Sequence, residues 1–263
     1  MGLRLQTVHA FLARAPSKGP HERPDGEFTG YDEADLDIRV LLALARTNSS
    51  LAHVACIPDF SACLDDAHVS FDLARSSKRC TGKGIRAGVV ASGLLTRDAK
   101  LWLPPDLTTQ LYQCRRKRFV VCNFGLYATS DLESGHANAL IFDTKHRIIE
   151  RYEPTGRSRD VVDASLERLF GRALPHWTYI GTALAAPARG AQRRATDRFR
   201  GLCVTFSLLY VLMRLLNPET PAETLNHYLG SMDGDRMRDT VLRLNRYAAN
   251  LLRRYERGSL ARD

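Results

Sequence analysis

Hydrophobic and polar positions follow the most regular pattern in the second half of the chain, where they predict strands followed by helices. Residues 119–127 are rich in side chains that favour strands. A short apolar run at 139–142, a polar turn at 143–146 and a second run at 147–152 predict a β-hairpin. The first of these runs is typical of a strand that is buried on both faces.

Helical periodicity follows the hairpin. Residues 160–174 carry apolar side chains at helical spacing, and a short strand is expected at 177–180. A strongly apolar helix is expected from Cys203 to about Leu216, followed by two further helices at 221–229 and 233–255. This order of elements predicts an α+β fold.

The first 115 residues give weaker signals. Apolar positions at helical spacing predict a helix at 31–47. Residues 76–98 are rich in glycine, serine and basic side chains, so we expect a loop there with one short strand at 87–91. Residues 1–30 are expected to be weakly ordered and flexible, apart from residues 5–14.

The composition of the 263-residue chain is that of an ordinary globular protein, with 44% hydrophobic and 25% charged residues. The apolar runs are shorter than the roughly 18–20 residues of a membrane span, so no contact with a membrane is expected. The six cysteines are scattered without the dense spacing of a disulfide framework. We therefore expect reduced thiols in an intracellular protein.

The net charge of +9 raises the question of an acidic partner. Basic residues concentrate at 115–118, at 189–200 and in the last thirty residues. Such runs favour an acidic partner, either nucleic acid or an acidic protein face. A solvated, arginine-rich surface is the alternative, because the runs lack the interleaved aromatic residues of a groove for single strands.

Cys203 stands at the expected start of the apolar helix, directly after Gly201-Leu202. A cysteine attacks as its thiolate, and an ordinary thiol with a pKa of about 8.5 is mostly protonated at neutral pH. The partial positive charge of a helix N-terminus and an adjacent imidazolium both lower a thiol pKa. Cys203 has the first from its position, and His136 is the nearest candidate for the second.

A catalytic imidazole needs a third group to orient its ring. In the predicted hairpin, His136 and Glu153 are about equally far from a turn centred on 144–145, so we expect them opposite each other on adjacent strands. Asp143 would lie at the other end of the hairpin and is excluded as the partner. Gln192, the only glutamine between residues 114 and 203, is the candidate side-chain donor to an oxyanion.

Each of these residues also has a plain structural interpretation. A cysteine at the head of an apolar helix is often a small buried side chain. A histidine beside a strand is often a core or surface residue, and a glutamate before a proline can end a strand. The joint spacing of the set favours the catalytic interpretation.

A zinc-stabilised binding module is an alternative that the first half of the chain raises. Its ligands would be the thiols and imidazoles of His53, Cys56, Cys63 and His68. Their spacing matches no standard zinc finger, and the residues between the two cysteines look like a plain turn. We therefore expect no metal and no cofactor.

The residues of the candidate site resemble the adenain and SUMO or ubiquitin-like-protein protease superfamily of cysteine peptidases (clan CE), and more closely its predicted peptidases of large DNA viruses. In that group a histidine is followed 17 residues later by an acid, as His136 is by Glu153 in a Tyr-Glu-Pro context. A glutamine and a Gly-x-Cys at the helix start follow, here Gln192 and 201–203. The viral relatives continue into an Arg-Leu-x-Asn-Pro pattern, here 214–218.

The resemblance covers about residues 118–230, and the chain departs from the group at two points. Many members have tryptophan directly after the histidine, where this chain has Ala137. The glutamine usually precedes the cysteine by six or seven residues, whereas Gln192 precedes Cys203 by eleven.

The resemblance implies a papain-like or adenain-like α+β fold, with a central mixed β-sheet and the nucleophile at the N-terminus of a buried helix. It implies a cysteine peptidase in which His136 is general base and acid, Glu153 orients it, Cys203 attacks, and Gln192 donates to the oxyanion. Residues 1–115 would form an N-terminal region, 116–257 the catalytic core, and 258–263 a tail.

The implied substrate is a protein cut after a Gly-Gly-like sequence, either ubiquitin or a ubiquitin-like modifier, or a viral precursor. By analogy, the basic surface would bind nucleic acid. We expect a monomer that acts inside a host cell, in cytoplasm or nucleus, or in a virion. Two alternatives stay open: an acyltransferase of the YopJ type that uses the same triad, and a basic nucleic-acid-binding protein with a degenerate peptidase fold.

Overall fold

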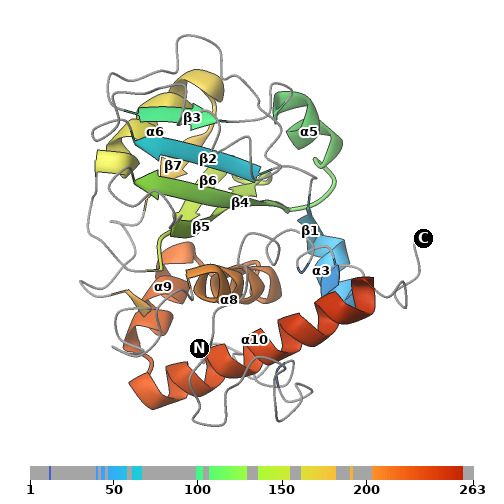
Figure 1. Cartoon of the computed structure of the whole chain (residues 1–263). Helices are drawn as coiled ribbons and strands as arrows, with labels where there is room; N and C mark the ends of the chain where they lie inside the picture. Colours follow the sequence, from blue (N-terminus) through green and yellow to red (C-terminus); the bar gives the residue numbers. More distant parts are fainter. Residues whose placement is uncertain are drawn as a thin grey trace.

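The computed structural model describes the chain at residues 12, 40, 43–44, 47–57, 61–66, 99–102, 107–128, 136–154, 161–181, 190–191 and 203–256. In these residues a single seven-stranded sheet lies between two layers of helices (Figure 1). The α+β class predicted from the sequence is therefore confirmed.

The sheet is mixed, and its strands follow the order β3-β2-β4-β5-β6-β7, with β1 also paired to β4. The strands are β1 Ala55–Cys56, β2 Ser61–Asp66, β3 Ala99–Trp102, β4 Phe119–Ala128, β5 His136–Asp143, β6 Ile148–Tyr152 and β7 Thr178–Ile180. The β4–β5, β5–β6 and β2–β3 pairs are antiparallel. The β1–β4, β2–β4 and β6–β7 pairs are parallel.

Helices cover both faces of this sheet. They are α3 Ser49–Val54, α5 Leu107–Gln113, α6 Val161–Ala173, α8 Cys203–Leu216, α9 Ala222–Ser231 and α10 Gly234–Glu256. Figure 1 shows α5 and α6 on one side of the strands and α8, α9 and α10 on the other. Helix α8 is the central one, because every residue from Cys203 to Leu215 is buried.

Two apolar cores form because consecutive strand residues point to opposite faces of the sheet. Val121 and Ile141 pack with α8, α9 and α10 in one cluster. Val120, Leu140 and Phe142 pack with α5 and α6 in the other. The central strands β4 and β5 are therefore buried on both faces, as the continuous apolar run at 139–142 predicts.

Most predicted elements of the second half are confirmed, including the hairpin and the four helices that begin at 160, 203, 221 and 233. Of the helix expected at 31–47, the described residues Val40, Ala43, Leu44 and Thr47 are helical. The strand expected at 87–91 lies outside the described residues. Strands β2 and β3 were not predicted.

Strands β1 to β3 come from the region expected to stand apart from the catalytic core. They nevertheless belong to the same sheet as β4, and β2 runs parallel to β4 with Ser61 opposite Asn123. The sheet therefore crosses the boundary placed at residue 115, and the division into three parts stays a prediction.

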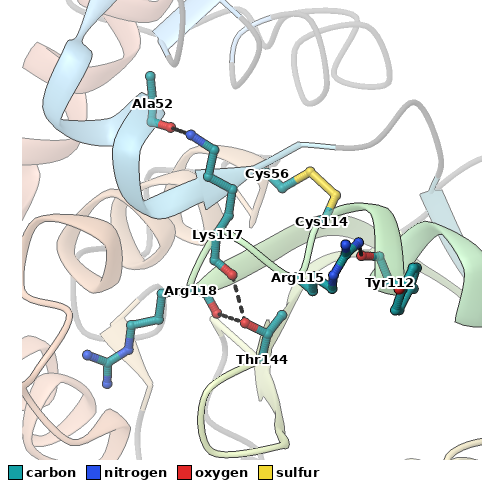
Figure 2. The surroundings of a disulfide bond; sticks show 8 residues. All are labelled: Ala52, Cys56, Tyr112, Cys114, Arg115, Lys117, Arg118 and Thr144. Atoms are coloured by element: carbon teal, nitrogen blue, oxygen red, sulfur yellow. Dashed lines mark hydrogen bonds between the residues drawn. A yellow bond between two sulfur atoms is a disulfide. The ribbon is translucent and has the colours of Figure 1, made fainter.

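Cys56 and Cys114 form a disulfide that joins the end of β1 to the turn after α5, with a Cα–Cα distance of 5.7 Å (Figure 2). The expectation of six reduced cysteines is thus wrong for this pair, because pairing of β1 with β4 brings two distant cysteines together. Close by, Lys117 Nζ donates to the carbonyl oxygen of Ala52, and Thr144 Oγ1 donates to that of Lys117 at 2.7 Å.

The same disulfide bears on the zinc alternative, since the sulfur of Cys56 is bonded to Cys114. Cys63 lies within β2, and His68 is outside the described residues. Within the described ranges, no group of three or more potential ligand side chains could hold a metal ion. Nor is any helix there both long enough and apolar enough to cross a membrane.

Candidate active site

Cys203 is the first residue of α8 and is 5% exposed. The helix begins there, so the backbone N–H groups of its first turn surround the position of the sulfur with partial positive charge. This confirms the predicted placement of the cysteine at the N-terminal end of a buried helix.

Ala137 connects the first turn of α8 to the start of β5. Its backbone N–H lies 3.4 Å from Cys203 Sγ and donates to it. Its carbonyl oxygen accepts from Ser207 Oγ at 3.3 Å, one helical turn further along α8. The backbone of the residue next to His136 is thus held against the cysteine sulfur.

Helix α8 can lie beside Ala137 because β6 ends before it reaches this position of β5. Strands β5 and β6 pair with Ala139 opposite Tyr152, so a continued register would bring Pro154 opposite Ala137. Proline has no backbone N–H and cannot extend the ladder. The edge of β5 therefore stays open to α8 at the position where the candidate nucleophile lies.

The register also corrects the predicted relation between the histidine and the acid. Continued by one residue beyond Tyr152, it places Glu153 opposite Asn138, two positions from His136. The expectation that His136 and Glu153 lie directly opposite each other is therefore wrong. Their positions are diagonal neighbours on one face, which at about 7–8 Å is still within reach of long side chains.

The turn of the hairpin explains the difference. Asp143 Oδ1 accepts from the backbone N–H groups of Lys145 and His146, both at 3.1 Å. Arg147 then adopts the left-handed conformation, with φ of 55°. The turn comprises residues 144–147, so its centre lies one residue later than predicted.

Glu153 itself is buried, at 3% exposure. Its Oε2 accepts from Arg151 Nη2 at 3.3 Å. Burial and the negative charge of Glu153 together raise the pKa of the adjacent Tyr152 far above its usual range, so the phenol stays neutral. The Tyr152 ring stacks on Tyr210 of α8 at 4.2 Å, which fixes the end of β6 against the helix.

Arg151 is a residue that the sequence analysis missed. Its side chain is fully buried in a network with Asn138, Glu153 and Asp163. The available signal was a charged residue in a strand that starts with two isoleucines. The sequence did not reveal which groups would neutralise it.

At the opposite end of the hairpin, Asp143 contacts His146 Nδ1 at 2.9 Å and Arg118 Nη2 at 3.5 Å. Burial raises the pKa of Asp143, but the hydrogen bonds from His146 and the charge of Arg118 outweigh it, and the net pKa is lowered. Asp143 lies seven residues along β5 from His136, at the end of the hairpin where it was expected.

A second buried ion pair links α8 to β6. Arg214 donates to both carboxylate oxygens of Glu150, with the shortest contact at 2.7 Å. Arg214 Nη1 also donates to the carbonyl oxygens of Pro218 and Thr220. The Arg-Leu-x-Asn-Pro pattern therefore ends α8 and fixes it to the strand that leads to Glu153.

Gln192, Gly201 and Leu202 lie outside the described residues. The two residues before the glutamine, Gly190 and Ala191, are described and buried. The oxyanion role of Gln192 stays a prediction, as do the roles of His136, Glu153 and Cys203.

Comparisons with known proteins give similarity to solved structures alone. No family model and no curated protein matches the chain. The fold is similar to the effector protein ChlaDUB1 of Chlamydia trachomatis, at 11% identity over 94% of this chain and 88% of that one, with a TM-score of 0.45. It is also similar to the SUMO protease Ulp1, at 11% identity over 94% and 92%, with a TM-score of 0.40.

A third similar structure is the ASFV pS273R protease, at 16% identity over 82% of this chain and 71% of that one, with a TM-score of 0.39. No identity exceeds 16% and no TM-score exceeds 0.45 among these three. The chemistry of the site is therefore argued from the chain's own residues alone.

Proposed function

We propose that this chain is a cysteine peptidase with Cys203 as its nucleophile. His136 is the general base and acid, Glu153 orients the imidazole, and Gln192 donates to the oxyanion beside the backbone N–H of Cys203. The observation that supports this most is the 3.4 Å contact from the Ala137 N–H to Cys203 Sγ. It places the residue next to His136 at the sulfur.

The contact also has a chemical consequence. An N–H donor stabilises a thiolate more than a thiol, because hydrogen bonds to a charged acceptor are stronger. The N-terminal end of α8 acts in the same direction. Both groups are built from backbone, so they are held in place before any substrate binds.

In the reaction, His136 accepts the proton of Cys203, and the thiolate attacks the carbonyl carbon of the scissile bond. The tetrahedral oxyanion collapses, the C–N bond breaks, and the amine leaves with the proton from His136. Water then attacks the thioester, giving up a proton to His136. The carboxylic acid leaves, and the proton returns to the sulfur.

The substrate class comes from the sequence resemblance: a protein cut after a Gly-Gly-like sequence, either a ubiquitin-like modifier or a viral precursor. Each step uses groups of the protein and water, and the proposed mechanism includes no cofactor. The basic runs of the chain are proposed to bind an acidic partner such as nucleic acid.

The test is cleavage of ubiquitin and SUMO carrying a fluorogenic amide at the C-terminus, together with Gly-Gly peptides of the same kind. Cys203→Ala should abolish turnover of whichever substrate is cut. Cys122→Ala is the matched control, because Cys122 is a buried cysteine outside the disulfide and lies in β4.

Activity that survives in Cys203→Ala would refute the nucleophile. Absence of hydrolysis, together with transfer of an acyl group from acyl-CoA to a protein amine, would replace peptidase by acyltransferase. Salt-dependent DNA binding without selective reactivity of Cys203 would favour a degenerate, non-enzymatic fold.

A further inference from the structure

Arg151 occupies a position where a cation is costly unless it is fully paired. The side chain is 0% exposed, and its guanidinium donates charge-assisted hydrogen bonds to side chains from other elements. Nη1 donates to Asp163 Oδ1 at 2.9 Å, and Nη2 to Glu153 Oε2 at 3.3 Å. Nε donates to Asn138 Oδ1 at 2.8 Å. Each arm of the planar group thus contacts a different partner.

Arg151 contacts two acids at once, Glu153 and Asp163. All three side chains are at most 8% exposed, so solvent screens them little. Each carboxylate is therefore attracted strongly to the Arg151 guanidinium.

The hydrogen bonds from Arg151 to the two acids differ in length. Its shorter contact is with Asp163, which also accepts from Tyr179 Oη at 2.7 Å. The longer contact, at 3.3 Å, is with Glu153. Arg151 therefore holds Glu153 in place, while Asp163 receives its stronger bond.

The cluster is anchored in three elements besides β6. Asp163 lies in the first turn of α6, where a carboxylate is favoured, and Tyr179 lies in β7. Asn138 lies in β5, two residues from His136. Gly181 lets the backbone pack closely on Asp163, since an added Cβ would lie 2.5 Å from Asp163 Cγ.

We infer that Arg151 is a positioning residue for Glu153: it fixes the acid of the triad against α6 and β7, so that Glu153 can orient His136. This rests on the proposed function. In this scheme Arg151 acts through Glu153.

The test follows the rate at which iodoacetamide alkylates Cys203 between about pH 5 and pH 9, by peptide mass spectrometry. This small reagent needs no knowledge of the substrate. In the wild type, ion pairing with His136 should keep Cys203 reactive well below the pKa of about 8.5 of an ordinary thiol. Arg151→Met should lower the rate at pH 6 roughly 10- to 100-fold, as loss of partners that orient metal ligands does.

The matched control is Arg118→Met. Arg118 is also mostly buried and pairs with a buried carboxylate, Asp143, but at the far end of the hairpin. Its replacement should leave the pH profile of Cys203 unchanged. Arg151→Lys keeps the positive charge but lacks the planar, forked guanidinium. Its alkylation rate at pH 6 should lie between those of the wild type and Arg151→Met.

The same substitution in a variant that already lacks the Glu153 carboxylate distinguishes positioning of Glu153 from a merely structural role of Arg151. In Glu153→Gln, the further change Arg151→Met should alter the rate less than about twofold, because the two residues act as one unit. An unchanged profile in Arg151→Met, or the same loss in both backgrounds, overturns the inference.

If Arg151→Met does not fold, Arg151→Met with Asp163→Asn removes one charge of each sign, and it should show the same change of profile. An unchanged profile in this double variant overturns the inference as well. If wild-type Cys203 reacts like an ordinary thiol, the proposed function itself fails. If His136→Ala changes the profile and Arg151→Met does not, the inference alone fails.

Discussion

Replacing Arg214 by methionine should loosen the helix that carries Cys203 and destabilise the whole protein. Arg214 and Glu150 are both 4% exposed, and three contacts of 2.7 to 3.1 Å join them. The variant keeps most of the volume of the side chain but leaves the carboxylate of Glu150 buried. The hydrogen bond that Glu150 then still accepts from Tyr210 Oη is long, at 3.4 Å.

Removing one member of a buried ion pair costs about 3–5 kcal/mol, because the other charge stays desolvated. The carbonyl oxygens of Pro218 and Thr220 also lose a donor. We therefore expect Arg214→Met to lower the free energy of unfolding by about 4 kcal/mol. Adding Glu150→Gln removes the unpaired carboxylate charge. It should restore about 2 kcal/mol of the free energy of unfolding, measured as a coupling energy.

The assay is urea unfolding followed by tryptophan fluorescence. Arg243→Met is the control, because Arg243 pairs with Asp239 at 2.9 Å, also shorter than 3 Å, but both side chains are about half exposed. Such a helical pair contributes only about 0.3–0.5 kcal/mol. A loss below about 1 kcal/mol in Arg214→Met, or equal losses in the two variants, would refute the assigned role of the buried pair.

Two further predictions concern Asp143 and the disulfide. The folded pKa of Asp143 is lowered from 3.8, so its ionisation stabilises the fold above that pH, and the effect is lost as the pH falls through the folded value. Asp143→Asn should therefore be less stable than the wild type at pH 7, and the gap in urea midpoint should narrow below about pH 4; a gap independent of pH contradicts this. Cys114→Ser opens a disulfide that spans 58 residues. It should cost about 4 kcal/mol by loop entropy, and a variant as stable as the oxidised wild type would show that the bond contributes nothing.

The elements nearest the candidate site could be predicted because their side chains have a strong local pattern. The apolar run at 139–142 and the polar turn after it determine β5 and β6, and the continuous apolar stretch after Cys203 determines α8. Strand β2 carries no such pattern, since Ser61–Asp66 mixes small, apolar and acidic residues. It becomes a strand by pairing with β4, about sixty residues later in the chain.

Other features depend on single conformations or on distant partners. The register of the hairpin follows from the left-handed Arg147, which no hydrophobic pattern indicates. Arg151 looks like a solvated surface residue in the sequence, because its partner Asp163 arrives from α6 only when the fold is complete. The Cys56–Cys114 bond likewise needs β1 beside β4 before the two sulfurs can meet.

The central claim is that Cys203 and His136 form one nucleophilic unit. It is tested most directly by alkylating the native protein at about pH 6 with less than one equivalent of iodoacetamide and mapping the label over all six cysteines. We expect Cys203 to carry most of the label and His136→Ala to abolish this preference. Label shared evenly with Cys122, or a preference for Cys203 that survives in His136→Ala, would contradict it.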